Sequence, residues 1–284
     1  PVEPIEAAVP ALAEKLSPEG SLDAATAIMT TDRVPKNLAV SFMLDGKEVR
    51  IGGISKGSGM IHPNMCTMLC FLTTDAAISA KMLGHALRLA VRDSFNMLSV
   101  DEDMSTNDTC LLLANGKAGN EEITAAGPAF HTFVQALSGL CQELAREMAK
   151  DGEGATKLVV CKVEGAKDDE TARTAAKAVI CSSLVKAAMF GADANWGRVL
   201  CALGYCGADL DVHRVDVAFS SKAGRLSVCE NGAGVPFDED LAKKVLSADE
   251  VEILVALHAG AACAEAYGCD LTYDYVKING DYRT

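Results

Sequence analysis

The stretch Lys56-Gly-Ser-Gly-Met-Ile-His-Pro-Asn-Met-Cys-Thr-Met-Leu-Cys-Phe-Leu-Thr-Thr-Asp75 passes from a glycine-rich loop into an apolar run. Glycine and proline interrupt regular backbone, so the loop should deliver Thr67 to the start of a buried element. A hydroxyl at such a junction is either an ordinary residue at a strand start or a nucleophile with a base beside it. If the bond between Cys66 and Thr67 is cut, the new α-amine of Thr67 can be that base. The stretch alone leaves both interpretations open.

The composition predicts one large domain or two ordinary ones. The chain has 284 residues, of which 49% are apolar, enough for a sizeable core. We expect residues 1–165 to form a core domain that carries the Lys56–Asp75 stretch, and residues 166–284 to form a smaller C-terminal α/β domain. The formal net charge of −13 would repel a polyanion, so a nucleic-acid partner is excluded.

Neither a signal peptide nor a membrane span is expected from the sequence. The N-terminus, Pro1-Val-Glu-Pro4, lacks a basic region and a long apolar core, and no uncharged apolar run approaches spanning length. We therefore expect no membrane partner and a location in the cytoplasm, or in an organelle matrix if the source is eukaryotic.

The eleven cysteines are interpreted as reduced thiols of the core. Their number is odd, the chain is large, and most lie in apolar runs. His62, Cys66 and Cys70 are spaced by four residues, but no second ligand pair with zinc spacing follows. No nucleotide-binding loop signature is evident either. We expect neither a metal nor a cofactor.

The periodicity of apolar residues predicts an α/β or α+β protein. Asp45-Gly46 is typical of a tight hairpin turn between strands over 39–44 and 47–51. Helices are expected over 75–98, 127–150, 168–190, 198–204 and 238–246. Further strands are expected over 110–114, 157–163, 215–219, 225–229, 251–257 and, as the final one, 270–278.

Polar residues gather at several expected element ends. Thr30 and Thr31, followed by Asp32, are either simple turn chemistry or part of a polar pocket. In the acidic run 99–109, Asp101 and Asp108 could wall a pocket, but the pattern favours capping and turn roles. A lone glutamate at a corner is usually solvated, yet the glycines on both sides of Glu153 allow a close approach of backbone.

Several of these stretches together resemble one family along the whole chain. Lys56 to Leu69 resembles the processing and nucleophile segment of the ornithine acetyltransferases (glutamate N-acetyltransferases) of arginine biosynthesis. Further stretches resemble that family's motifs in the right order: Met29-Thr-Thr-Asp32, Asp101 to Leu113, Asp151-Gly-Glu-Gly-Ala-Thr156, Asn195-Trp-Gly-Arg198, and Cys269 to Asn279 with Tyr282-Arg-Thr284.

The resemblance implies a fold and a reaction. The fold is an αββα sandwich-like core of the N-terminal-nucleophile type. The precursor would cut itself between Cys66 and Thr67 into α and β chains. Thr67 would then take an acetyl group from N-acetylornithine and pass it to glutamate. Substrate-contacting positions match Thr30, Thr31, Lys56, Thr67, Glu153, Asn279 and Thr284.

The resemblance also implies partners. They are the two small substrates and a heterotetramer of the α and β products or an assembly with an upstream chain. The residues do not decide whether acetyl-coenzyme A is a further donor. A lysine and a glutamate suit a substrate that bears a carboxylate and an amine.

Three departures from the family pattern keep alternatives open. The family has a further N-terminal region with a Thr-Gly pair that lines its oxyanion hole, and we find no match for it. Without such donors, turnover should fall about a hundredfold or more. Cys66 stands where the family usually has alanine, and could compete as nucleophile. The chain is continuous across Cys66 and Thr67. An amidase or aminopeptidase with an N-terminal nucleophile, and an unprocessed or truncated non-catalytic member, therefore remain alternatives.

Overall fold

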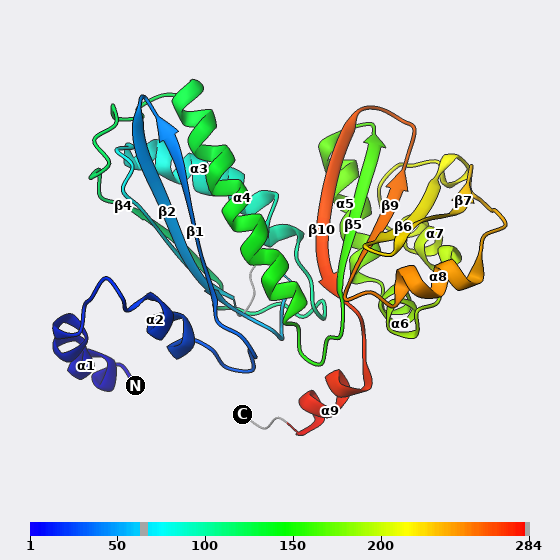
Figure 1. Ribbon diagram of the computed structural model, residues 1–284, viewed down its shortest axis with the longest axis horizontal. Coiled ribbons are helices and arrows are strands. Elements are labelled where there is room, and N and C mark those ends of the chain that lie inside the picture. Colours follow the sequence, from blue (N-terminus) through cyan, green and yellow to red (C-terminus); the bar gives the residue numbers. More distant parts are fainter. Residues whose placement is uncertain (63–67, 282–284) are drawn as a thin grey trace.

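The computed structural model describes residues 1–62 and 68–281 and divides their strands between two β-sheets (Figure 1). The first part of the chain forms α1 (Glu3–Glu14), α2 (Ser21–Ala27), β1 (Lys36–Leu44), β2 (Lys47–Lys56), β3 (Leu69–Thr74), α3 (Ala80–Arg92), the 3₁₀-helix η1 (Phe95–Met97), β4 (Thr109–Ala114) and α4 (Pro128–Lys150). The second part forms β5 (Leu158–Ala166), α5 (Asp169–Cys181), α6 (Ser183–Gly191), α7 (Trp196–Gly204), the 3₁₀-helix η2 (Val212–Arg214), β6 (Asp216–Ser221), β7 (Gly224–Glu230), β8 (Ala233–Gly234), α8 (Glu239–Leu246), β9 (Glu250–Ala256), β10 (Ala262–Cys269) and α9 (Tyr273–Asp281). The predicted mixed α/β class is confirmed.

The first sheet has the strand order β1-β2-β3-β4 and is antiparallel except between β3 and β4. Its hairpin turns at Asp45 and Gly46, whose φ angles of 49° and 75° are those of a primed turn. The hairpin predicted from this Asp-Gly pair is therefore confirmed. The chain leaves this sheet at Lys56 and re-enters it at Leu69, which is paired with Lys56.

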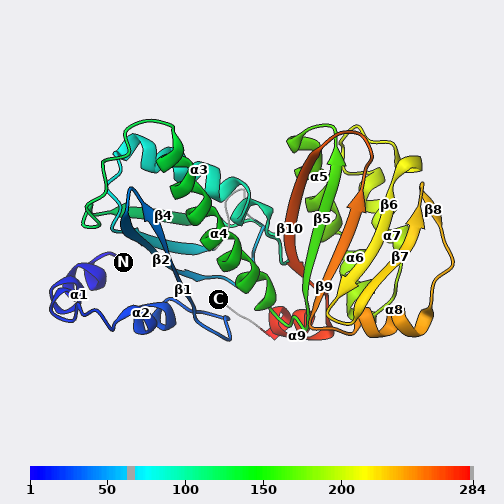
Figure 2. The same ribbon diagram turned by 45° about the horizontal axis from the view of Figure 1, so that its top comes forward.

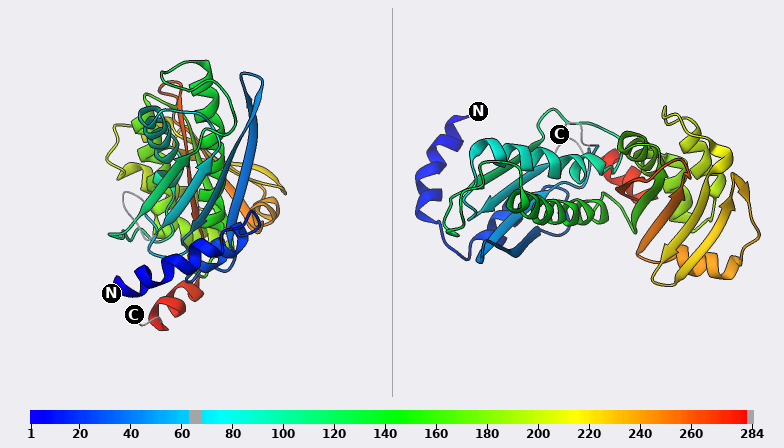
Figure 3. Two further views of the ribbon diagram at one scale, coloured as in Figure 1. Left: turned by 90° about the vertical axis from the view of Figure 1, so that its left-hand side faces the viewer. Right: turned by 90° about the horizontal axis from the view of Figure 1, so that it is seen from above.

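Helices α3 and α4 cover one face of the first sheet, as the view from above in Figure 3 shows. The apolar stripe that predicted α4 is buried along its length: Phe130, Phe133, Leu137, Leu140, Cys141, Leu144 and Met148. The other face leaves Met43, Leu111 and Leu113 exposed. A helix layer on a sheet, which is one half of the predicted αββα arrangement, is thus present.

Helix α3 is shorter than the helix predicted over 75–98. The backbone of Asp75 is held to β2, because Asp75 N donates to Arg50 O at 3.4 Å and Arg50 N donates to Asp75 Oδ1 at 2.8 Å. The chain becomes helical only after Ser79, whose Oγ accepts from Met82 N as an N-cap. Helical periodicity alone did not reveal these extended residues.

The second sheet has the order β10-β5-β9-β6-β7-β8. The predicted pairing of the strands around Phe219 and Leu226 is confirmed, since β6 and β7 are antiparallel neighbours. Helix α5 packs against β10 and β5, and α8 packs against β6 and β7. The single helix predicted over 168–190 is broken at Ser182, whose side chain accepts from Val185 N and caps α6.

The prediction of a final strand over 270–278 is wrong. These residues form a short loop and helix α9, which begins after Thr272, whose Oγ1 accepts from Tyr275 N. The strand precedes it as β10, which is rich in alanine and has little β propensity. Small residues suit β10 because α5 lies close: a Cβ on Gly268 would be 2.4 Å from Ile180 Cγ2. Contacts in the folded chain, rather than the intrinsic propensity of the residues, therefore decide that β10 is a strand and α9 a helix.

Helix α4 lies between the two sheets, packed against β1 and β2 on one side and β10 and β5 on the other (Figure 2). Because β5 belongs entirely to the second sheet, we propose a boundary near residue 157 in place of the one expected after residue 165. Among residues 1–62 and 68–281, no single helix is long and apolar enough to cross a membrane. Helices α5 and α6 reach that length and apolarity only together, and they are bent by 58° at their junction.

Candidate active site

Part of the predicted site can be placed in space. Cys66, Thr67 and Thr284 lie outside the described residues. The five other predicted residues come from four separate segments of the chain: Thr30, Thr31, Lys56, Glu153 and Asn279. Their contacts show whether the sequence motifs converge.

Lys56, the last residue of β2, is buried and points to Thr30. Its Nζ donates to Thr30 Oγ1 at 3.1 Å, and the lysine is 6% exposed. A buried ammonium is costly unless it is paired. Within the described part of the chain, no carboxylate forms an ion pair with Lys56. Its charge is therefore available to the carboxylate of a ligand.

Ser58 joins Thr31 to Glu153. Thr31 Oγ1 lies 2.7 Å from Ser58 Oγ, and Glu153 N donates to Ser58 O at 2.8 Å. The neighbouring Gly59 lies directly against the glutamate, since a Cβ there would be 2.3 Å from Glu153 Cδ. Sequence reasoning did not single out Ser58, and its position between two glycines was the available signal.

Helix α9, which lies at the bottom of Figure 1, carries Asn279, and this residue contacts Glu153. Asn279 Nδ2 donates to Glu153 Oε2 at 2.8 Å. Gly154 has a φ of 68°, and a Cβ on it would be 2.4 Å from Tyr275 N, so only glycine fits beside α9. Thr272 Oγ1 adds a hydrogen bond to Gly154 O at 2.7 Å. The expectation that these glycines permit a close backbone approach is confirmed.

Two aspartates of the acidic run hold the backbone on either side of residues 63–67. Asp101 accepts from Met60 N at 2.7 Å and from Ile61 N at 2.9 Å, and Asp108 Oδ1 accepts from Met68 N at 2.9 Å. These are the structural roles that the sequence favoured. They also place residues 99–109 beside the Lys56–Asp75 stretch.

Asp108 is electrostatically perturbed as well. Burial raises the pKa of its carboxyl, although the N–H of Met68 and the charge of Lys56 partly oppose this. Its Oδ2 is shielded from solvent and has no hydrogen-bond partner within the described residues. Carboxylates with shifted pKa values concentrate at functional sites, so Asp108 supports a site at this end of β3 and β4.

His62 lies where the two parts of the molecule meet, between Ser99 of the first and Cys181 of the second, and we call this contact the seam. Its Nδ1 is 3.1 Å from Ser99 Oγ and 3.6 Å from Cys181 Sγ of α5. Burial, helped by the charge of Lys177, lowers the pKa of His62 to about 4. The imidazole is therefore neutral near pH 7.

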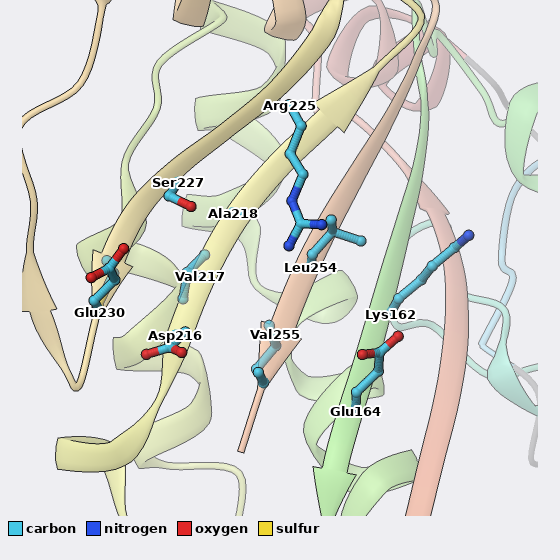
Figure 4. Close-up of a pocket in the computed structure, with 12 residues that line it drawn as sticks. Lys162, Glu164, Asp216, Val217, Ala218, Arg225, Ser227, Glu230, Leu254 and Val255 are labelled. Atoms are coloured by element: carbon cyan, nitrogen blue, oxygen red, sulfur yellow. The ribbon is translucent and has the colours of Figure 1, made fainter. Parts of the chain in front are cut away.

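A pocket of about 190 Å³ lies on the second sheet (Figure 4). It shares no residue with the place where Thr30, Lys56, Glu153 and Asn279 converge. Its polar side chains, among them Lys162, Glu164, Asp216 and Arg225, stand on the sheet and point away from the apolar core. Because Glu164 and Arg225 are exposed to solvent, their charges are screened and poorly fixed. We place the site at the convergence of the first sheet and α9 instead.

The convergence offers complementary charges in a fixed arrangement. Lys56 and Thr30 make one polar corner, and Glu153 and Asn279 make another, with Ser58 linking the two segments. A buried cation suits a ligand carboxylate and a carboxylate suits a ligand amine. The described residues therefore fit a small molecule of amino-acid type.

Comparison with known proteins identifies the family. The family model described as "ArgJ family" matches residues 1–284. The chain belongs to the ArgJ family. An "Arginine biosynthesis bifunctional protein ArgJ 1" from Clostridium acetobutylicum is 55% identical over 258 residues, covering 91% of this chain and 63% of that protein. The ArgJ of Bacillus subtilis is 46% identical over 283 residues, covering 100% of this chain and 68% of its own length.

A crystal structure supports the same assignment. The ArgJ of Bacillus halodurans matches with a TM-score of 0.70 and 42% sequence identity, covering 75% of this chain and 98% of that one. The resemblance inferred from the ordered motifs is thus confirmed, and so is the predicted fold class. This ArgJ-family chain spans about two thirds of the length of the relatives from C. acetobutylicum and B. subtilis.

Proposed function

We propose that this ArgJ-family chain transfers an acetyl group from N-acetylornithine to glutamate in arginine biosynthesis. A role in arginine biosynthesis agrees with the names of the relatives. The observation that carries the finer assignment is the convergence of Lys56, Thr30, Glu153 and Asn279. Donor and acceptor both carry an α-carboxylate, which Lys56 can bind in turn, and the free side-chain amine of N-acetylornithine suits Glu153.

The proposed reaction proceeds through an acetyl ester of Thr67. After cleavage between Cys66 and Thr67, the free α-amine of Thr67 accepts the hydroxyl proton while Oγ attacks the acetyl carbonyl. The tetrahedral intermediate collapses by breaking the amide C–N bond, and the leaving amine of ornithine takes that proton. The amine of glutamate then attacks the ester, and the proton that it loses restores the hydroxyl. The two halves make a ping-pong sequence.

Mass spectrometry of the purified protein tests this proposal. A chain that begins at Thr67 should gain one acetyl group when N-acetylornithine is added and lose it when glutamate follows. Thr67→Ala should abolish both acetylation and cleavage, whereas the exposed Thr73→Ala on β3 should leave both intact. An unacetylated chain, or full transfer by Thr67→Ala, would refute the proposal.

Two further outcomes separate the alternatives. Release of acetate without glutamate would indicate an amidase in which water accepts the acyl group. Acetylation of Thr67 by acetyl-coenzyme A would add the second donor. The α/β heterotetramer and the location in the cytoplasm stay predictions, which the mass of the native assembly and cell fractionation can test.

A further inference from the structure

A buried lysine lies behind the convergence of site residues. Lys36 begins β1 and is 0% exposed. Its Nζ lies 2.6 Å from Asp32 Oδ1 and 2.6 Å from Asp151 Oδ2, and both carboxylates are buried. Lys36 is thus one buried cation between two buried anions, and the exposed Arg33 adds a second cation on Asp151. Neither the sequence motifs nor the proposed reaction gives Lys36 a role.

Asp32 connects Lys36 to two segments of the site. Besides Lys36, its Oδ1 accepts from Gly57 N at 2.8 Å, and its Oδ2 accepts from Thr30 N at 3.2 Å. Thr30 and Gly57 are, respectively, the partner and the neighbour of Lys56. Burial alone would raise the pKa of Asp32, but the hydrogen bonds from Lys36 and Gly57 outweigh it and lower the pKa. The carboxylate therefore stays ionised while it orients both backbones.

Asp151 connects Lys36 to the third segment. It follows the last residue of α4 and precedes Gly152 and Glu153. Its carboxylate also accepts from the backbone N and from Nε of Arg33, at 2.9 and 3.0 Å. The loop that ends in Glu153 is therefore tied to the loop that carries Thr30.

We propose that Lys36, together with Asp32 and Asp151, is a positioning residue that holds the Thr30, Lys56 and Glu153 segments in one arrangement. The proposal rests on the proposed function, in which these segments contact substrate. A role in stability is a poor explanation for the trio of Lys36, Asp32 and Asp151, because a buried ion group often stabilises a protein no more than apolar residues of the same volume do. The partners favour positioning, since the other hydrogen bonds of both carboxylates go to these segments.

Hydrogen exchange measures the linkage without any need for catalysis. In Asp32→Asn one side-chain oxygen must serve three donors, so at least one bond is lost while Lys36 keeps Asp151. Amides of residues 29–32 and 57–61 should exchange at least tenfold faster, and those of β5 and β9 should not change. Unchanged exchange in both site segments would overturn the proposal. So would a rise spread over the whole chain, as expected of the core variant Ile253→Ala in β9.

A variant in which Lys36, Asp32 and Asp151 are all replaced by uncharged residues (the neutral trio) separates a positioning role from a role in stability. Lys36→Met combined with Asp32→Asn and Asp151→Asn leaves no unpaired buried charge, so this variant should fold better than Lys36→Met alone. We expect its KM for N-acetylornithine to rise at least tenfold while Ile253→Ala keeps KM within twofold. A wild-type KM in the neutral trio would overturn the proposal. If the trio does not fold, the KM of Asp32→Asn decides by the same criterion.

The two assays also separate this proposal from the proposed function. If the wild-type protein transfers no acetyl group, the proposed function fails, and the exchange pattern still shows whether the trio links the three segments. If the wild-type protein transfers the acetyl group but the substitutions at Lys36, Asp32 and Asp151 change neither hydrogen exchange nor KM, only the positioning role fails.

Discussion

The two regions of the molecule bury very different kinds of side chain. The first-sheet region, residues 1–157, buries Asp32, Lys36, Lys56 and Asp151. Among the described residues of the second-sheet region, residues 158–281, the buried charged side chains are Lys186 and Asp270. Both face the first-sheet region, since Lys186 donates to Val100 O and Asp270 accepts from Thr156 N at 2.8 Å. Otherwise that region packs apolar residues around Phe219 and Ile253.

The difference shows what each region contributes. Apolar burial is a strong and non-directional source of stability. Buried charges cost desolvation, which is repaid only when their geometry is well satisfied. The second-sheet region therefore suits a scaffold, which supports α4 and carries α9 to Glu153, and the first-sheet region suits a fixed polar site. Variants in the two regions should accordingly fail in different ways.

The largest effect is expected from Phe219→Ala in the second-sheet core. The fully buried ring lies on β6, and its removal should lower the free energy of unfolding by about 3–5 kcal/mol. Because none of the site residues that the structure describes belongs to the apolar core around Phe219, KM for N-acetylornithine should change less than twofold in the fraction that stays folded. Urea denaturation and initial-rate kinetics check both parts. The half-exposed Phe190→Ala is the control and should cost far less. A large change in KM with little loss of stability would erase the distinction between the regions.

The next largest effect is expected from Lys56→Met, and it should fall on activity. The variant keeps the length of the side chain but removes the charge that we assign to the substrate carboxylate. Losing a charged hydrogen bond to a ligand should lower kcat/KM by about a hundredfold, which corresponds to about 2.7 kcal/mol. The exposed Lys47→Met at the other end of β2 should leave kcat/KM unchanged. An equal loss in both variants would argue for a general effect of charge.

The sequence predicted which residues lie close together better than it predicted the helices and strands that carry them. Motif order brought Thr30, Lys56, Glu153 and Asn279 together across more than 200 positions, and the contacts from Lys56 to Thr30 and from Asn279 to Glu153 agree. Yet Asn279 was expected after a strand, whereas it lies on helix α9. Motifs identify residues, but the alternating apolar pattern of 270–278 does not report that Thr272 caps a helix there.

The supporting residues could not be predicted for a physical reason. Asp32 was interpreted as part of a turn, and Lys36 lies before the strand predicted over 39–44, because nothing local shows that Asp151, more than a hundred positions away, completes the ion group. Likewise, β10 is rich in alanine because α5 lies on it, and such packing is a property of the whole fold. Contacts distant in sequence decide these positions, and single-sequence patterns contain only local information.

A smaller effect is expected from Asn279→Ala. The substitution removes the hydrogen bond to Glu153, which is worth about 1 kcal/mol, and leaves the carboxylate free to turn. We expect KM for N-acetylornithine to rise about fivefold, with the melting temperature nearly unchanged because Asn279 is exposed. Lys277→Ala on the same helix is the matched control. If both variants raise KM alike, α9 acts through its docking and the amide has no role of its own.

The smallest effect is expected at the seam itself, from the pH dependence of His62. The folded pKa of about 4 lies below the ordinary 6.5, so between these values the unfolded chain binds more protons than the folded one. The contribution of His62 to stability is therefore complete above pH 6.5 and is lost as the pH falls to about 4. After allowance for the partial exposure of the ring to solvent, we expect about 1 kcal/mol.

His62→Gln should flatten that part of the curve, measured by urea denaturation between pH 4.5 and 7.5, while the exposed His131→Gln on α4 should not. Since His62 touches both Ser99 and Cys181, the slope reports on contact between the two regions. An unchanged slope would mean that the seam is open to water, and the scaffold would then support the site through α4 and α9 alone.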